Sequence, residues 1–121
     1  MRVLGDLDTI MAGLACGEVS LVAWDVLRLG AGDALAIADE CAAEAMRALA
    51  QGAAGDPRIV AGEAGVGGLA GLMAIAGNDA VRRSLALGPE SRVLIVGSEG
   101  ATDPVVYGQI VGRTPEAVAA S

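Results

Sequence analysis

The 121-residue sequence contains no lysine, no histidine and no phenylalanine. A serine–histidine–aspartate triad, a cysteine–histidine pair and a histidine metal site each need an imidazole, so the lack of histidine excludes all three. An internal Schiff base needs a lysine amine, which the chain also lacks. We therefore assign no catalytic residue and no metal-binding residue to this chain.

Basic residues and long apolar runs are also scarce. Eight basic residues stand against 15 acidic ones, which gives a formal net charge of −7. Such a surface repels phosphate backbones and anionic lipid, so we expect neither nucleic acid nor a membrane as a partner. The longest uninterrupted apolar stretch, residues 64–77, is shorter than the roughly 18–20 residues that cross a bilayer.

Cysteine is equally sparse, with only Cys16 and Cys41. Two widely spaced cysteines do not indicate a disulfide scaffold, and no secretory signal opens the chain. We expect reduced thiols and a cytoplasmic location. Cys16, without a nearby base, and Cys41 are interpreted as small packing residues. The chain's two aromatic residues, Trp24 and Tyr107, have apolar neighbours at helical spacing, which favours packing in a core.

Short apolar segments alternate with amphipathic ones along the chain. Helices are predicted after Ser20 (21–29), from Asp39, after residues 63–68 to about residue 85, and after the Asp103-Pro104 and Thr114-Pro115 pairs. Strands are predicted at 34–38, 58–62 and 92–96. This order predicts an α/β fold, in which a parallel sheet carries helices on both faces. Ligands bind at the carboxyl ends of such strands, which selects the loops 62–68 and 97–103.

The first of these loops is rich in glycine. Residues 65–70 fit the spacing GxGxxG/A of dinucleotide-binding loops. That fold also needs an acid about 20 residues further on, and the first acid after the next predicted strand, Glu99, lies too far along. Close packing of a helix on a strand explains the glycines better. Glu63 in the same loop is either a carboxylate beside a ligand or, as the spacing favours, a first-turn acid that matches a helix dipole.

The second loop, residues 98–103, combines hydroxyls, carboxylates and glycine. Asp103 followed by a proline is explained by helix capping alone. Capping does not explain Ser98, Glu99 and Gly100 at the end of an apolar segment. These three residues are a candidate site.

Several separated segments resemble one family, diaminopropionate ammonia-lyase, which belongs to the fold-type II pyridoxal-phosphate enzymes. The similar segments are Thr9–Glu18 with Ser20 and Ala23-Trp24, then Asp56-Pro57 with Ile59–Gly65, then Val93–Ile95 with Ser98–Pro104 and Tyr107. Their order and spacing also match, from Asp8 to about Arg113. The resemblance implies that residues 1–121 form a single segment, an incomplete C-terminal part of the large domain of such a lyase.

The resemblance also implies a chemistry and a set of binding residues. The family uses pyridoxal phosphate to convert 2,3-diaminopropionate to pyruvate and ammonia. By resemblance, Ser98 faces the nitrogen of the cofactor ring, a role that suits a neutral hydroxyl. The remaining cofactor-binding residues implied by the resemblance are Gly62, Glu63, Ala15, Cys16 and Gly100, with Gly17 in the same loop and with Glu99 and Asp103 shaping the ring-nitrogen loop.

The sequence departs from the family in ways that limit this function. Val19, Ala64 and Ala101 replace residues that the family usually has as proline, serine and aspartate. The Schiff-base lysine of the family lies upstream of the similar region. We therefore expect a fragment or split subunit that is inactive alone, and that self-associates or needs a complementary N-terminal half. The alternatives are a fragment of another fold-type II deaminase, similar to threonine dehydratase, and a non-catalytic interaction module.

Overall fold

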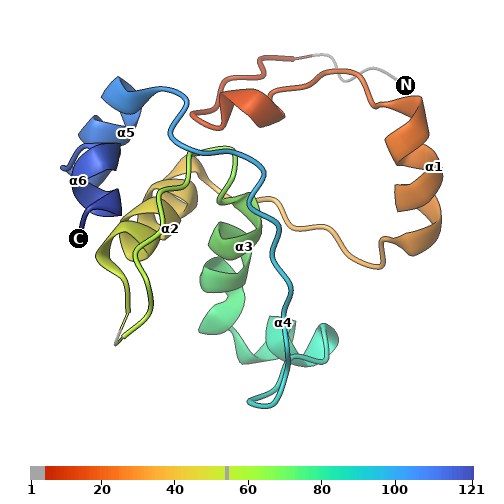
Figure 1. Ribbon diagram of the computed structural model, residues 1–121. Coiled ribbons are helices and arrows are strands. Elements are labelled where there is room, and N and C mark those ends of the chain that lie inside the picture. Colours follow the sequence, from red (N-terminus) through yellow and green to blue (C-terminus); the bar gives the residue numbers. More distant parts are fainter. Residues whose placement is uncertain (1–4, 54) are drawn as a thin grey trace.

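The computed structural model describes residues 5–53 and 55–121, and its regular structure is helical (Figure 1). A short 3₁₀ turn, η1, spans Ala12–Leu14. The α-helices are α1 (Leu21–Gly30), α2 (Asp39–Gln51), α3 (Gly67–Ala76), α4 (Asp79–Ser84), α5 (Pro104–Val111) and α6 (Pro115–Ala119). None of the helices in the described ranges is long and apolar enough to cross a membrane.

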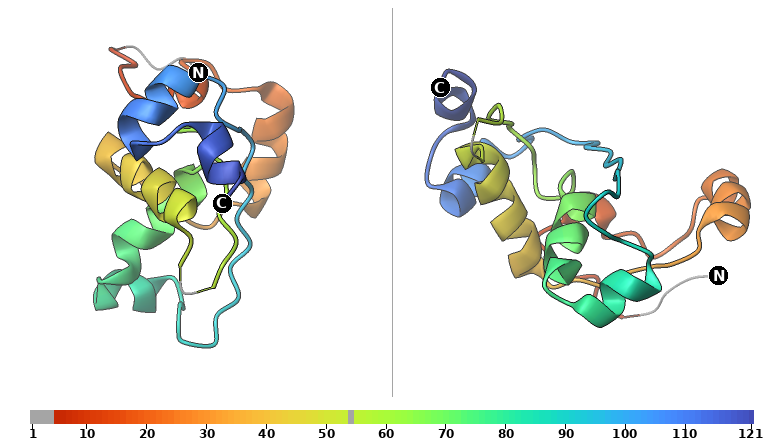
Figure 2. Two further views of the ribbon diagram at one scale, coloured as in Figure 1. Left: turned by 60° about the vertical axis from the view of Figure 1, so that its left-hand side comes forward. Right: turned by 90° about the horizontal axis from the view of Figure 1, so that it is seen from below.

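The core lies where α2 packs against α3 and α5 (Figures 1 and 2). Helix α2 is amphipathic, as its sequence predicts, and its face with Ala42, Ala45 and Met46 is fully buried. The buried apolar residues of this core are Met11, Ala42, Ala45, Met46, Ala50, Ala61, Ala64, Val66, Ala70, Tyr107 and Val118. The prediction that Tyr107 packs in a core is confirmed.

The two C-terminal helices begin at the residues that the sequence indicates. The Asp103 carboxylate accepts hydrogen bonds from the backbone N–H groups of Val105 and Val106, at 3.0 and 2.9 Å. The Thr114 hydroxyl accepts one from the Ala117 N–H at 3.2 Å. Each cap satisfies donors that the first helical turn leaves unpaired, and each is followed by proline at the first helical position.

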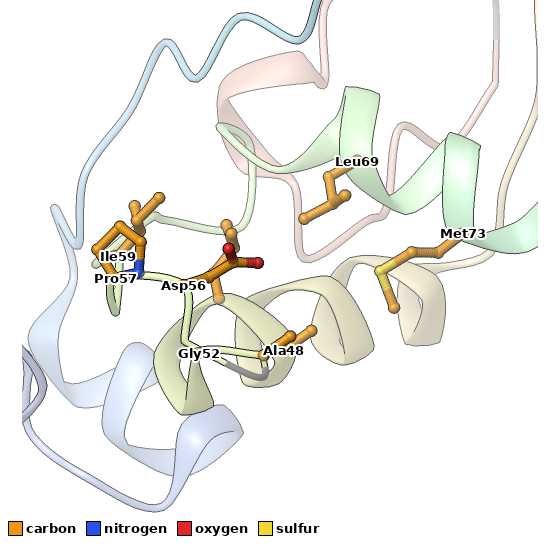
Figure 3. Close-up of a pocket in the computed structure, with 9 residues that line it drawn as sticks. Ala48, Gly52, Asp56, Pro57, Ile59, Leu69 and Met73 are labelled. Atoms are coloured by element: carbon orange, nitrogen blue, oxygen red, sulfur yellow. The ribbon is translucent and has the colours of Figure 1, made fainter. Parts of the chain in front are cut away.

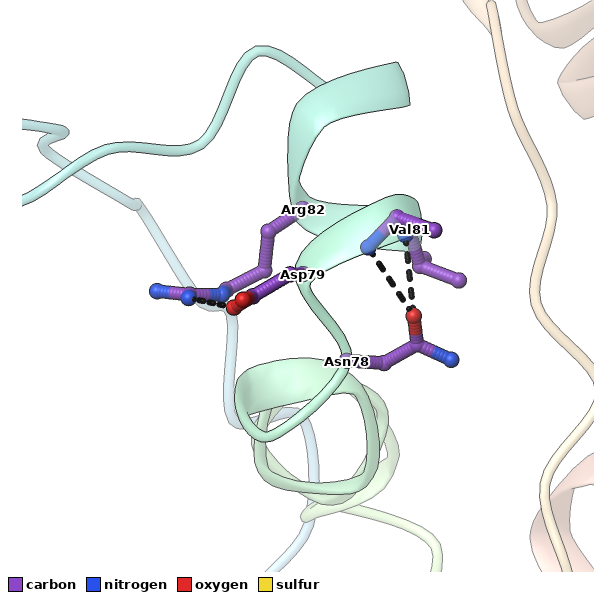
Figure 4. Close-up of polar contacts among 5 residues, drawn as sticks. Asn78, Asp79, Val81 and Arg82 are labelled. Atoms are coloured by element: carbon purple, nitrogen blue, oxygen red, sulfur yellow. Dashed lines mark hydrogen bonds and ion pairs between the residues drawn. The ribbon is translucent and has the colours of Figure 1, made fainter.

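The single helix predicted to run to about residue 85 is broken into α3 and α4. The Asn78 side chain accepts hydrogen bonds from the Ala80 and Val81 N–H groups, both at 3.1 Å, and so starts a new helix (Figure 4). Asp79 and Arg82 form an ion pair on its first turn. An asparagine cap after a glycine therefore ends one helix and starts the next.

The prediction of an α/β fold with a parallel sheet is wrong. The described residues form no sheet, and the three predicted strands, 34–38, 58–62 and 92–96, contain neither strand nor helix. Apolar and β-branched residues favour an extended backbone, but a strand exists only where a neighbour completes its hydrogen-bonded ladder. Nothing in the sequence pattern of these segments specifies which neighbour they have.

Helix α1 stands apart from the core (Figures 1 and 2). It begins where predicted, after Ser20, whose hydroxyl accepts a hydrogen bond from the Ala23 N–H at 3.4 Å. None of its residues is buried. The Trp24 side chain is half exposed, so the prediction that Trp24 packs in a core is wrong for the described part of the chain.

Candidate functional site

Two loops that are distant in sequence meet through their backbones. The Gly62 N–H donates a hydrogen bond to the Glu99 carbonyl at 3.1 Å. A Cβ atom on Gly62 would lie 2.2 Å from the Gly100 carbonyl oxygen, and one on Gly65 would lie 2.5 Å from the Glu99 carbonyl oxygen. Both positions therefore need glycine because main chain touches main chain there. Close packing therefore explains Gly62 and Gly65, although the contact joins two loops rather than a helix and the predicted strand.

A third segment, η1, lies against the same two loops. A Cβ atom on Gly13 would lie 3.1 Å from the Cβ of Ala64 and 3.8 Å from one carboxylate oxygen of Glu99. The turn that leads into η1 is tied to α2, since the Thr9 hydroxyl donates to Asp39 Oδ1 at 2.5 Å and the Ile10 N–H donates to Asp39 Oδ2 at 2.9 Å. First the Thr9 hydroxyl and then the Ile10 N–H hold the pKa of Asp39 below its ordinary value.

Together the three segments enclose a shallow groove of about 450 Å³. Its lining residues are Gly13, Leu14, Ala64, Ser98, Glu99, Gly100 and Thr102. The three candidate residues predicted from the sequence, Ser98, Glu99 and Gly100, all line this groove, and Ser98 and Gly100 are exposed. The groove combines glycine and alanine with Leu14, the Glu99 carboxylate and the neutral hydroxyls of Ser98 and Thr102.

Two carboxylates lie at the junction of the loops. Glu63 is only 7% exposed, and its Oε2 is buried without a hydrogen-bond partner among the described residues. Glu99 accepts a hydrogen bond from the Thr102 hydroxyl through Oε1 at 2.8 Å, while its Oε2 is likewise buried and unpartnered there. Because α3 begins only at Gly67, the interpretation of Glu63 as a first-turn acid is wrong. Buried carboxylate oxygens normally accept a hydrogen bond. At this junction the Oε2 atoms of Glu63 and Glu99 have no donor among the described residues.

The predicted residues are not all brought to the groove surface. Gly62 and Glu63 are buried behind it. Ala15 and Cys16 follow η1 but do not line the groove. Cys16 is exposed, so its interpretation as a packing residue is wrong, whereas Cys41 is half-buried against the core.

Sequence reasoning assigned no role to four lining residues, which are Gly13, Leu14, Ala64 and Thr102. The Glu-x-x-Thr spacing of Glu99 and Thr102 was the available signal for the last of them. No local pattern indicates Gly13 and Leu14, because their position depends on the contact between Thr9 and Asp39, 30 residues apart.

A second hollow is apolar. It has a volume of about 300 Å³ and lies between α2 and α3, where Leu69 and Met73 of α3 are opposite Ala48 of α2 (Figure 3). Asp56 provides the one ionisable side chain among its described lining residues. It therefore offers surface for packing rather than groups for chemistry.

Known proteins resemble this chain over most of its length. No protein-family profile matches it. Diaminopropionate ammonia-lyase of Escherichia coli K12 is 39% identical over 122 residues, which cover 98% of this chain and 31% of that enzyme. Diaminopropionate ammonia-lyase of Salmonella typhimurium is 37% identical over 114 residues, covering 90% of this chain and 28% of that enzyme. The chain thus spans about a third of the length of these curated relatives.

Solved structures give the same result. The E. coli enzyme in complex with D-serine superposes with a TM-score of 0.78 at 37% identity, covering 88% of this chain and 28% of that one. The same enzyme in complex with an aminoacrylate–pyridoxal-phosphate azomethine reaction intermediate gives a TM-score of 0.73 at 38% identity, covering 85% and 28%. Sequence and backbone therefore agree with the predicted resemblance: this chain is similar to the C-terminal part of diaminopropionate ammonia-lyase.

Proposed function

We propose that this chain forms one wall of the pyridoxal-phosphate pocket of a diaminopropionate ammonia-lyase, and that polypeptide corresponding to the rest of the relatives completes the pocket. The observation that carries this proposal is the groove where residues 98–102 meet η1 and residues 62–65. Its residues lie in the region shared with an enzyme solved in complex with a pyridoxal-phosphate intermediate.

The residues of the groove fit the edge of a cofactor ring. Gly13, Ala64 and Gly100 leave a surface without large side chains, against which a flat ring can lie. Ser98 contributes an exposed hydroxyl that can pair with a ring nitrogen without carrying charge. The anchoring part of the site has no counterpart here, because the chain contains no lysine. The amine that holds the cofactor must therefore come from the complementary part.

Each part of the wall has a separate task in this proposal. The cofactor, when bound, withdraws electrons from the substrate's α-carbon and so permits loss of the α-proton and then of the β-amine. Ser98 orients the ring, and the Thr102–Glu99 hydrogen bond holds the loop that carries Ser98. Gly62 sets the spacing behind that loop. Glu63 lies buried behind the groove, and Ala15 and Cys16 lie beside it after η1.

The test is a chimera in which this chain replaces the matching third of the E. coli enzyme. We expect the chimera to bind pyridoxal phosphate and to form pyruvate from 2,3-diaminopropionate, and the isolated 121-residue chain to form none. Ser98→Ala in the chimera should lower kcat and shift the absorbance of the bound cofactor. Ser91→Ala is the matched control, since Ser91 lies away from this groove and its hydroxyl accepts a hydrogen bond from the Gly88 N–H.

The same assay separates the alternatives. A chimera that acts faster on serine or threonine than on 2,3-diaminopropionate would favour a deaminase similar to threonine dehydratase. A folded chimera that binds no pyridoxal phosphate would contradict the proposed function and favour an interaction module. A cytoplasmic location belongs to the same proposal and is supported by the low cysteine content.

A further inference from the structure

Helix α1 exposes apolar side chains around most of its circumference. Leu21, Val22 and Leu29 are 78, 81 and 77% exposed. At 100° per residue, Asp25 and Arg28 lie on one narrow side, where they form an ion pair of 3.1 Å. The other large apolar side chains of the helix are Trp24, Val26 and Leu27, which are also exposed. A helix that is apolar on nearly all sides is typical of a protein interior.

The core of this chain does not cover α1. None of the described core residues comes from α1, and Figure 1 and the right-hand view of Figure 2 show the helix separated from α2 and α3. Residues 31–36, which link α1 to the core, are exposed as well. The Ser20 side chain nevertheless caps the N-terminus of the helix. An intact helix with exposed apolar sides is a docking element rather than an unfolded tail.

We infer that α1 is the arm by which this chain docks onto the complementary part of the lyase, where the helix becomes buried; this inference rests on the proposed function. The match to the E. coli enzyme covers 98% of this chain, so α1 falls within the region shared with a protein about three times as long. The polypeptide that such a relative has outside the matched region is therefore the partner that we expect to cover α1.

Two other occupants fit the observations less well. A ten-residue helix is about 15 Å long, half the roughly 30 Å of a bilayer's hydrocarbon core, and a chain of net charge −7 is repelled by anionic lipid. A second copy carries the same −7, so two copies repel each other as they approach.

Trp24 makes the inference directly measurable, because it is the only tryptophan of the chain. The isolated chain and the chimera with the E. coli enzyme are labelled with 5-fluorotryptophan, and the Trp24 resonance is assigned with Trp24→Phe. We expect the ¹⁹F shift of Trp24 between H₂O and D₂O, which reports solvent contact, to be present in the isolated chain and largely lost in the chimera. An equal shift in both proteins would overturn the inference.

A matched pair of variants tests whether apolar contact is responsible. In the chimera, Leu27→Gln should lower the melting temperature by several degrees, whereas Arg28→Gln, on the polar side of the same helix, should leave it unchanged. Equal effects would count against docking through the apolar sides. If the chimera is insoluble, the complementary two-thirds of the E. coli enzyme is titrated into the labelled chain, and a Trp24 resonance that never shifts overturns the inference.

The outcomes also separate docking from catalysis. A chimera that forms pyruvate while Trp24 stays exposed overturns the docking inference and keeps the proposed function. A chimera that buries Trp24 but neither binds pyridoxal phosphate nor forms pyruvate keeps the docking and overturns the function. Loss of the Trp24 solvent shift in the isolated chain as its concentration rises would identify a second copy as the occupant and overturn the inference.

Discussion

Helices α1 and α2 are both well-formed helices, yet only one of them is buried. Helix α2 carries more polar residues, and its alanine- and methionine-bearing face is fully enclosed by α3 and α5. Helix α1 is the more apolar of the two, and none of its residues is buried. The difference shows that local signals such as capping decide whether a helix forms, whereas burial needs a surface elsewhere in the protein. Apolar content alone does not predict membership of the core in this chain.

The largest expected effect contrasts one apolar side chain from each helix. Met46 is 1% exposed in α2 and Leu27 is 51% exposed in α1. We expect Met46→Ala to lower the free energy of unfolding of the isolated chain by about 3 kcal/mol, and Leu27→Ala to change it by less than about 0.5 kcal/mol. Urea unfolding followed by circular dichroism measures both. Equal losses would contradict the separation of α1 from the core.

A smaller effect is expected at the backbone contact between the two loops of the groove, where residues 62–65 meet residues 99 and 100. Gly62→Ala should cost about 2 kcal/mol, because its Cβ would meet backbone that cannot move aside. Gly100→Ala is the matched control: it lies in the same contact, but its own Cβ would meet nothing within 4 Å. Thermal unfolding of both variants is the measurement, and a neutral Gly62→Ala would show that the loops are not in backbone contact.

The N-terminal caps of α1 and α5 allow a helix outside the core to be compared with one that packs in it. Asp103→Ala should cost about 1 kcal/mol in global stability, because α5 carries the buried Tyr107. Ser20→Ala removes the cap of α1 and should lower the helicity of that arm without moving the unfolding midpoint of the core. Hydrogen exchange at single amides separates the two results. A shift of the whole unfolding transition by Ser20→Ala would mean that α1 is coupled to the core.

The smallest effect concerns the clamp between Thr9 and α2. Its hydrogen bonds lower the pKa of Asp39 in the folded chain, so the clamp stabilises the fold above the ordinary pKa of 3.8 and is lost as pH falls through the lower, folded value. Thr9→Val should therefore raise the pKa of Asp39 towards its ordinary value, while Thr114→Val should not. A carbon-13 titration of the aspartate carboxyls checks this, and an unchanged Asp39 pKa would rule out the clamp.

The sequence predicted what depends on neighbours in the chain. The caps at Ser20, Asp103 and Thr114 act within three residues, and each starts a helix at the predicted position. The two candidate loops also meet, and Ser98 and Gly100 line their groove. The prediction of a sheet was wrong because strand pairing depends on contacts between segments distant in sequence, and the alternation of apolar residues within one segment does not specify them.

The burial of individual residues was the other weakness of sequence reasoning. Trp24 and Cys16 were expected to pack, and both have solvent contact. Their spacing indicates which side of a segment is apolar, but not whether another element lies against it. The role of Gly13 was missed for the same reason, since long-range contacts such as the one between Thr9 and Asp39 bring its segment to the groove.

The direct approach of Gly62 and Gly65 to residues 99 and 100 has a consequence for how the groove can diversify. Because carbonyl oxygens set the separation between the two loops, exchanging Ser98 for another residue changes which groups line the groove but not the separation of the loops. A single replacement at position 98 can therefore change which molecules the groove selects, while Gly62 and Gly65 keep the distance between the two loops constant.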